Sequence, residues 1–100
     1  MWGFLCNTKA RGVSFEGRQQ LVKALAIGDV LQVVAEPTNE HHTGAHALYY
    51  RNAKIGYLRR DLADTLVSTT YDYRAIVTQL TGKDFPLQGV NLRLEVNERL

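Results

Sequence analysis

Three histidines lie close together in a polar stretch of the chain. His41, His42 and His46 form the pattern H-H-x3-H, and imidazole is a common ligand of zinc and nickel. No cysteine is nearby and Glu40 is the one adjacent acid, so no familiar ligand set is complete. We therefore expect a solvated polar loop and no cofactor. Metal binding, base stacking and phosphate binding remain as functional alternatives for these histidines.

Basic and aromatic residues are interleaved in the segment that follows. Phosphates require cations, and unstacked bases pack on flat aromatic rings, so this composition is typical of a surface that binds a single strand. Only one face of each strand can meet a ligand, and the alternative is that tyrosines pack the core while cations maintain solubility. The residues concerned are Tyr49, Tyr50, Arg51, Lys54, Tyr57, Arg59 and Arg60.

A short helix is predicted directly after the two adjacent arginines, Arg59 and Arg60. The leading amides of a helix attract phosphate, although Asp61 in the first turn opposes an anion there. Asp61 and Asp64 are three residues apart, and exposed acids at this spacing usually only solvate a helix. The chain has no G-x-S-x-G motif and no glycine-rich phosphate loop. We therefore expect a protein that is not an enzyme.

Length and composition indicate one globular domain that spans residues 1–100. Apolar residues make up 45% of the chain and charged residues 22%, which excludes a disordered protein. The net charge of +2 is compatible with a polyanionic partner but is far from that of a histone-like protein. No apolar run is long enough to span a membrane, and the first residues lack the features of a secretion signal. The single cysteine, Cys6, favours a reducing cytoplasmic location.

The apolar pattern predicts a mainly β (α+β) fold. In the first predicted helix Leu21, Val22 and Leu25 have helical spacing, and Arg18 falls on the wet face. The last strand alternates cleanly, and its Glu95 is predicted to face outward. Six strands and two short helices in so small a chain predict a compact, OB-like or SH3-like six-stranded β-barrel. We place strands at 6–13, 30–35, 45–50, 54–58, 71–80 and 90–96, and helices before Gly28 and at 60–67.

Several short motifs occur in an order and at a spacing typical of one family. The motifs are residues 8–19 (TKARGVSFEGRQ), Gly28-Asp29, residues 36–39 (EPTN), Ala45, residues 54–58 (KIGYL) and residues 89–93 (GVNLR). Together they cover residues 8–96, and the chain resembles the HIRAN domain, specifically the small stand-alone bacterial type.

The resemblance implies a fold and a function. It implies an OB-like barrel that captures single-stranded DNA, particularly a free 3′ end, alongside the helicases and translocases of DNA repair. The pocket implied is built from the first strand and from the loop after the Asp/Glu-Pro motif. Family members usually carry Asn-Pro-Tyr-Asp in that loop. In this chain Asn39 is kept, Glu40 replaces the proline and His42 replaces the aspartate.

The function expected is a non-catalytic nucleic-acid-binding module linked to DNA repair or processing, with single-stranded or end-bearing DNA as its partner. A helicase or nuclease is the expected type of protein partner, and no membrane is involved. One alternative is a protein-interaction module without DNA binding, and another is metal binding through the three histidines. The cations would hold phosphates, and His41 and Tyr57 would stack on bases. The residues expected to contact nucleic acid are Lys9, Arg11, His41, His42, Lys54, Tyr57, Arg59 and Arg60.

Overall fold

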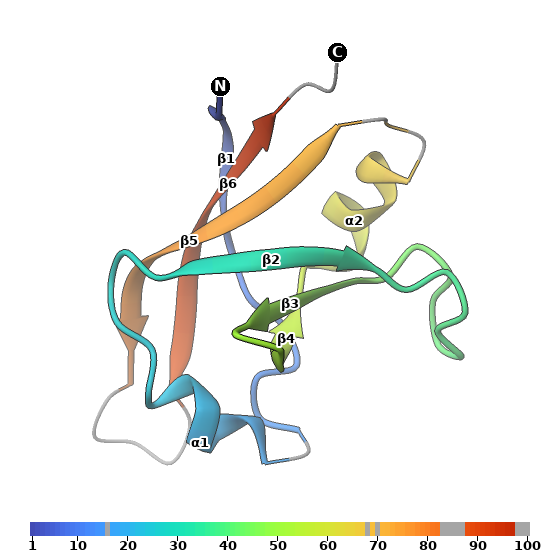
Figure 1. Cartoon of the computed structure of the whole chain (residues 1–100). Coiled ribbons are helices and arrows are strands. Elements are labelled where there is room, and N and C mark those ends of the chain that lie inside the picture. Colours follow the sequence, from blue (N-terminus) through green and yellow to red (C-terminus); the bar gives the residue numbers. More distant parts are fainter. Residues whose placement is uncertain (16, 68, 70, 83–87, 98–100) are drawn as a thin grey trace.

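The computed structural model describes residues 1–15, 17–67, 69, 71–82 and 88–97. Six antiparallel strands form one sheet with the order β1-β6-β5-β2-β3-β4 (Figure 1). The mainly β fold with two short helices is therefore confirmed. The strands are β1 (Gly3–Lys9), β2 (Val30–Ala35), β3 (His46–Tyr50), β4 (Ala53–Tyr57), β5 (Asp72–Thr81) and β6 (Gly89–Asn97), and the helices are α1 (Arg18–Val22) and α2 (Arg60–Leu66).

The sheet curls until its two ends approach each other. The chain just after β1 meets the end of β4 in an isolated bridge between Arg11 and Tyr57. The amide of Arg11 donates to the carbonyl of Tyr57 (2.7 Å), and the amide of Tyr57 donates to the carbonyl of Arg11 (2.8 Å). A Cβ atom on Gly56 would lie 2.7 Å from the Arg11 carbonyl oxygen, so this approach requires glycine. The barrel is therefore nearly closed, and we call the Arg11–Tyr57 bridge, where its two ends meet, the seam.

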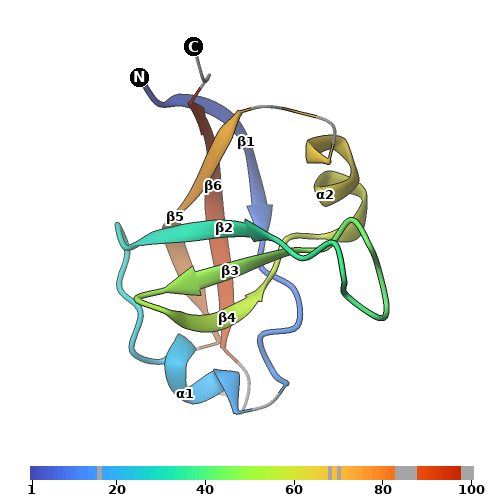
Figure 2. The ribbon, with the colours of Figure 1, turned by 45° about the vertical axis from the view of Figure 1, so that its right-hand side comes forward.

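The core fills the inside of this curled sheet. Because successive side chains of a strand point to opposite faces, every second residue of β6 is buried there. Figure 2 shows α1 below the β3–β4 hairpin and α2 above it. Val22 of α1 and Ala63 and Leu66 of α2 are buried. The largest fully buried side chains are Val22, Leu31, Leu48, Ile55, Val77, Val90, Leu92 and Leu94.

The bounds of β2 agree with prediction, and the turn between β3 and β4 is one residue shorter than the predicted turn over residues 51–53, because β4 begins at Ala53. Arg51 and Asn52 both have positive φ, at 49° and 69°, as a two-residue hairpin turn of this twist requires. The first strand differs, because it begins at Gly3 and ends at Lys9 rather than covering 6–13. Its pairing changes there: the Ala10 amide still donates to Val90 of β6, and Arg11 then joins β4.

The prediction of which face of the first helix is buried was wrong, whereas Glu95 faces outward as predicted. Leu21 is 40% exposed, whereas Arg18 is only 6% exposed; α1 has five residues and turns a different face toward the sheet than its spacing suggested. Glu95 lies on the outer face of the sheet, but it is only 8% exposed. The side chains of Arg74 and Arg93 cover it there, with bonds of 2.8 and 2.9 Å. Helix α1 ends at Val22, well before Gly28, and Gly28 has positive φ and precedes β2.

Both helices are short. Neither α1 nor α2, the helices of the part of the chain that the structure describes, has the length and apolar character needed to cross a bilayer.

Candidate nucleic-acid interface

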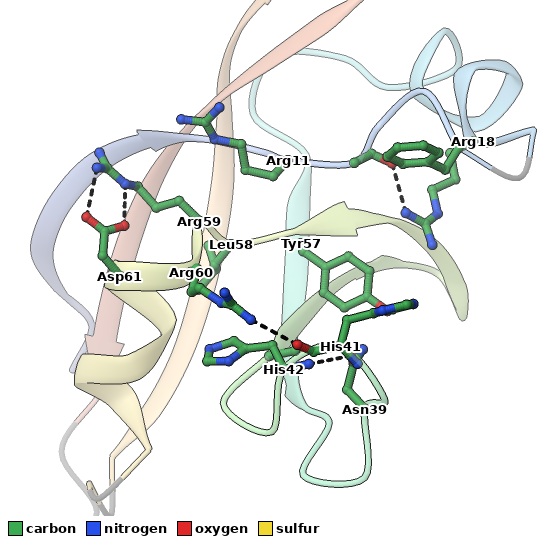
Figure 3. Close-up of a pocket in the computed structure, with 13 residues that line it drawn as sticks. Arg11, Arg18, Asn39, His41, His42, Tyr57, Leu58, Arg59, Arg60 and Asp61 are labelled. Carbon is green, nitrogen blue, oxygen red and sulfur yellow. Dashed lines mark hydrogen bonds and ion pairs between the residues drawn. The ribbon is translucent and has the colours of Figure 1, made fainter.

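A pocket of about 800 Å³ lies at the seam of the barrel, within the range of sites for small ligands. The Arg11–Tyr57 bridge forms its back, the loop of residues 39–45 forms one side, and the start of α2 forms another (Figure 3). Three chain segments that are distant in sequence therefore meet around one hollow. Its cationic and aromatic lining residues are Arg11, Phe15, Arg18, His41, His42, Tyr57, Arg59 and Arg60.

The pocket carries an excess of positive charge. Of the described residues that line it, four are arginines and only Asp61 is acidic. Asp61 accepts two hydrogen bonds from Arg59, at 2.6 and 2.8 Å, and a third from the Leu62 amide (2.9 Å). Arg59 therefore holds the pKa of Asp61 below its ordinary value. Because Asp61 occupies the first turn of α2 in this way, the anion site considered at that helix start is taken by the protein's own carboxylate.

Tyr57 is held in place by a network behind the pocket. Its hydroxyl donates to one oxygen of Glu36 (2.8 Å) and accepts from Lys54 (2.9 Å), while Lys54 pairs with the other oxygen of Glu36 (2.8 Å). The bonds from Lys54 to Glu36 and Tyr57 raise the pKa of Lys54. Partial burial opposes ionisation of Glu36, but hydrogen bonds from Lys54, Asn39 and Tyr57 outweigh it and lower the pKa of Glu36. The tyrosine ring thus has a fixed orientation.

The loop of residues 39–45, which contains His41 and His42, is anchored to the Glu36 carboxylate through Asn39. The Asn39 side-chain NH₂ donates to Glu36 (3.0 Å), and its oxygen accepts the amides of His41 (2.9 Å) and His42 (3.0 Å). This is an Asx turn, in which a short side chain replaces a backbone acceptor. One half-buried acid, Glu36, therefore positions both a tyrosine and a loop of the pocket.

Helix α2 holds the loop from the other side. Arg60 donates to the carbonyl of His41 (2.9 Å), and the Nε2 atom of His42 lies 2.6 Å from an oxygen of Asp64. The predicted pair of acids on α2 is thus divided, with Asp61 bound to Arg59 and Asp64 bound to His42. His41 is exposed, whereas His42 is half-buried.

Six of the eight residues expected to contact nucleic acid line the pocket. The two others are nearby: Lys54 lies behind Tyr57, and Lys9 lines a neighbouring groove that shares Arg11 and Arg59 with the pocket. The aromatic residues Tyr49 and Tyr50 are not among the lining residues, and Arg51 stacks on Tyr50, 5.2 Å from the ring centroid. Most of the expected contacts therefore converge, although they come from separate parts of the sequence.

Sequence reasoning missed the aromatic lining residue Phe15 and two lining residues with polar contacts, Arg18 and Asn39. Arg18 donates to the carbonyl of Gly12 (2.8 Å), and its guanidinium lies 5.3 Å from the centre of the Tyr57 ring. It had been placed on a solvated helix face. Asn39 lines the pocket and orders its loop. All three residues lie within the motifs that carry the family resemblance, at 8–19 and 36–39, and this was the signal available.

The three histidines do not converge. His46 is 7% exposed, and its Nδ1 atom is bonded to the carbonyl oxygen of Gly44 at 2.8 Å, while His42 faces Asp64. Across the described ranges of the chain, no group of three or more His, Cys, Asp or Glu side chains could hold a metal ion. The geometry therefore gives the metal alternative no support.

Comparisons with known proteins agree with the fold and with the sequence motifs. A crystal structure of a protein from Lactobacillus plantarum is similar, with a TM-score of 0.83, 20% identity and coverage of 99% of this chain and 98% of that one. The crystal structure of the HIRAN domain of human HLTF has a TM-score of 0.72 and 14% identity, with coverage of 91% and 73%. The search of curated proteins found no match. The family model described as the HIRAN domain matches residues 4–97, and the chain therefore belongs to the HIRAN domain family.

Proposed function

We propose that this protein is a non-catalytic module that binds single-stranded or end-bearing DNA in the pocket at the barrel seam. HIRAN domains are generally DNA-binding modules. The observation that carries the proposal is the charge of the pocket: four arginines line it, and its one described acid is already bound to Arg59. A polyanionic strand would replace the counterions of such a surface, which favours binding at low salt.

The proposed roles of the pocket residues follow from their own contacts. The side chain of Arg11 forms no ion pair with any residue that the structure describes, so it is free to bind a phosphate. Arg60 uses one nitrogen for the His41 carbonyl, and its other donors can reach a ligand. Tyr57 and His41 would stack on bases, and such stacking contributes about 1–3 kcal/mol per base.

The wider setting of this activity is inferred from the family resemblance. We place the protein in DNA repair or processing, with a helicase or nuclease as its protein partner and the cytoplasm as its location. The single described cysteine, Cys6, is free, which is compatible with a reducing compartment. We further propose that residues 1–100 act as one domain.

The alternative function is a protein-interaction module, and β1 is the observation that favours it. In the described sheet β1 pairs only with β6, and it exposes Phe4 and Leu5. A strand edge with exposed apolar side chains can pair with another chain. Partners of this kind would leave the pocket unused.

Fluorescence anisotropy with short labelled oligonucleotides separates these functions. The oligonucleotides are single-stranded DNA with a free 3′ end, the same strand with a blocked 3′ end, duplex DNA and single-stranded RNA, each at two salt concentrations. The proposal predicts micromolar or tighter binding of the single strand that weakens as salt rises. A preference for the free end would show that this loop recognises a 3′ end without the aspartate that the family usually carries there.

The same measurement can reject the proposal. Absence of binding to every oligonucleotide at low salt would contradict it and would favour the protein-interaction module. Binding that persists in an Arg11→Ala/Arg60→Ala variant with an unchanged salt dependence would show that the strand binds outside the pocket.

A further inference from the structure

A second hollow, of about 580 Å³, lies beside the pocket at the end of β1. Arg11 and Arg59 line both hollows, so the two share cationic walls. We call this second hollow the β1 groove. Its polar and charged lining residues include Asn7, Thr8, Lys9, Arg11, Arg59 and Asn91.

The charge of the β1 groove is positive throughout. Three of its lining residues are cations, and none of the described residues that line it is acidic. Arg59 is held by Asp61, but Lys9 and Arg11 form no ion pair within the described part of the chain. Unneutralised cations that line a hollow attract an anionic ligand. Because Arg11 belongs to both hollows, one anionic chain could contact them together.

Two buried oxygen atoms in the lining residues lack partners. The Thr8 hydroxyl and the Asn91 side-chain oxygen have no hydrogen-bond partner among the described residues, although the Asn91 NH₂ donates to Gln79 (3.0 Å). Buried polar groups without a partner are rare in folded proteins, because burial removes their hydrogen bonds to water. A nucleotide strand offers phosphate oxygens that can accept a hydrogen bond from the Thr8 hydroxyl.

The lining of the β1 groove also indicates which part of a strand it would hold. No aromatic side chain is among its described lining residues, whereas Tyr57 and His41 line the pocket. Bases need a flat ring on which to stack, and phosphates need only cations and donors. The β1 groove therefore fits the sugar–phosphate backbone of a strand and offers little to distinguish its bases.

We infer that a strand held in the pocket continues over Arg11 and Arg59 into the β1 groove, where Lys9 binds its phosphates. This inference rests on the proposed function, and it adds the path and the length of the bound strand. Binding through this groove depends on the number of nucleotides and tolerates changes of sequence.

A series of oligo(dT) strands, from dinucleotide to dodecamer, tests the inference by anisotropy at two salt concentrations. Lys9→Ala should leave the affinity for the shortest bound strand unchanged. It should weaken the dodecamer severalfold and reduce the slope of log affinity against log salt by about 0.7, the value of one phosphate contact on a single strand. Lys23→Ala is the matched control, because Lys23 is exposed and lines neither hollow. It should change neither quantity.

The outcomes separate this inference from the proposed function. If Arg60→Ala weakens strands of every length but Lys9→Ala weakens none, the pocket binds DNA and the path through the groove is wrong. If no strand binds at any length, both are wrong.

Thr8→Val gives a second and independent measurement, because it removes the hydroxyl and nearly preserves the shape. Removal of an unsatisfied buried group should maintain or raise the melting temperature. The affinity for the dodecamer should nevertheless fall relative to that for the shortest strand. An unchanged dodecamer affinity would remove this hydroxyl from the interface and count against the groove.

Discussion

Basic and aromatic side chains gather in two regions of this molecule, at the seam pocket and on the outer face of β1, β6 and β5. On the outer face, Arg74 lies 4.4 Å from the Trp2 ring centroid and Arg93 lies 4.6 Å from that of Phe4. Glu95 lies between the two arginines and accepts a bond from each, at 2.8 and 2.9 Å. The bonds from Arg74 and then Arg93 lower the pKa of Glu95 despite its burial.

The pocket contains similar residues in a different electrostatic state. Its single described acid faces Arg59 alone, and Arg11 and Arg60 remain available around a hollow. On the outer face one carboxylate serves both arginines and both arginines stack on rings, so little of their charge is left for a ligand. Interleaved basic and aromatic residues therefore do not by themselves identify a nucleic-acid site. The position of the acids distinguishes the two regions.

Paired substitutions of arginine should give the largest difference between the regions. Arg11→Ala/Arg60→Ala should weaken binding of single-stranded DNA by more than about tenfold and reduce the salt slope by about 1.4, because two phosphate contacts are lost. Arg74→Ala/Arg93→Ala removes the same charge from the outer face. Apart from the general effect of a lower net charge, it should change the affinity for single-stranded DNA by less than about twofold. Equal losses in the two variants, measured by anisotropy, would mean that only net charge matters.

A smaller effect is expected from Glu36, which positions the pocket without facing it. Glu36→Ala removes the anchors of Tyr57 and Asn39 and should weaken DNA binding by about three- to tenfold, since each hydrogen bond contributes about 0.5–1.5 kcal/mol. Glu40→Ala is the control, because it removes an equal charge from an exposed position in the same loop. It should leave affinity unchanged or slightly higher. If both variants bind more tightly, Glu36 has no positioning role.

Glu36 also makes stability depend on pH. Its pKa in the folded protein lies below the ordinary value of 4.5, so its contribution to stability is complete above about pH 4.5 and is lost as pH falls through the folded-state pKa. The melting temperature of the unchanged protein should therefore exceed that of Glu36→Ala at pH 7, and this gap should narrow below pH 4.5. A gap that stays constant down to pH 3 would contradict the pKa shift.

The smallest effect on binding is expected from Glu95. Glu95→Gln should leave affinity for single-stranded DNA within about twofold, or slightly raise it, because Arg74 and Arg93 lose their shared anion. The effect should appear in stability, as a melting temperature lower by a few degrees. A large loss of affinity with an unchanged melting temperature would transfer the binding role to the outer face.

The fold could be predicted from the sequence because the signals that define it are local. The alternation of β6 and the bounds of β2 both follow from neighbouring residues. The seam of the barrel could not be predicted in this way. It depends on two backbone hydrogen bonds between Arg11 and Tyr57, which are far apart in the chain. Gly56 permits the approach, but a glycine alone does not indicate which segment comes close.

The candidate site, like the fold, could be predicted only in part. Residue type and the family motifs indicated most of the pocket's cations, but they did not indicate which charges the protein neutralises itself. Lys54 was expected to meet a phosphate directly, yet its ammonium lies 2.8 Å from Glu36 and 2.9 Å from the Tyr57 hydroxyl. Arg18 was missed because the face that a helix of five residues buries depends on packing more than on spacing.

The most direct test of the pocket is an NMR titration of the isotopically labelled protein with a short single-stranded DNA at low salt. Our account predicts progressive shifts of the amide signals around Arg11, residues 39–42 and residues 57–60. Signals of the outer face, around Phe4, Arg74 and Glu95, should stay in place. Shifts confined to the outer face, or no shifts at saturating DNA, would contradict the account.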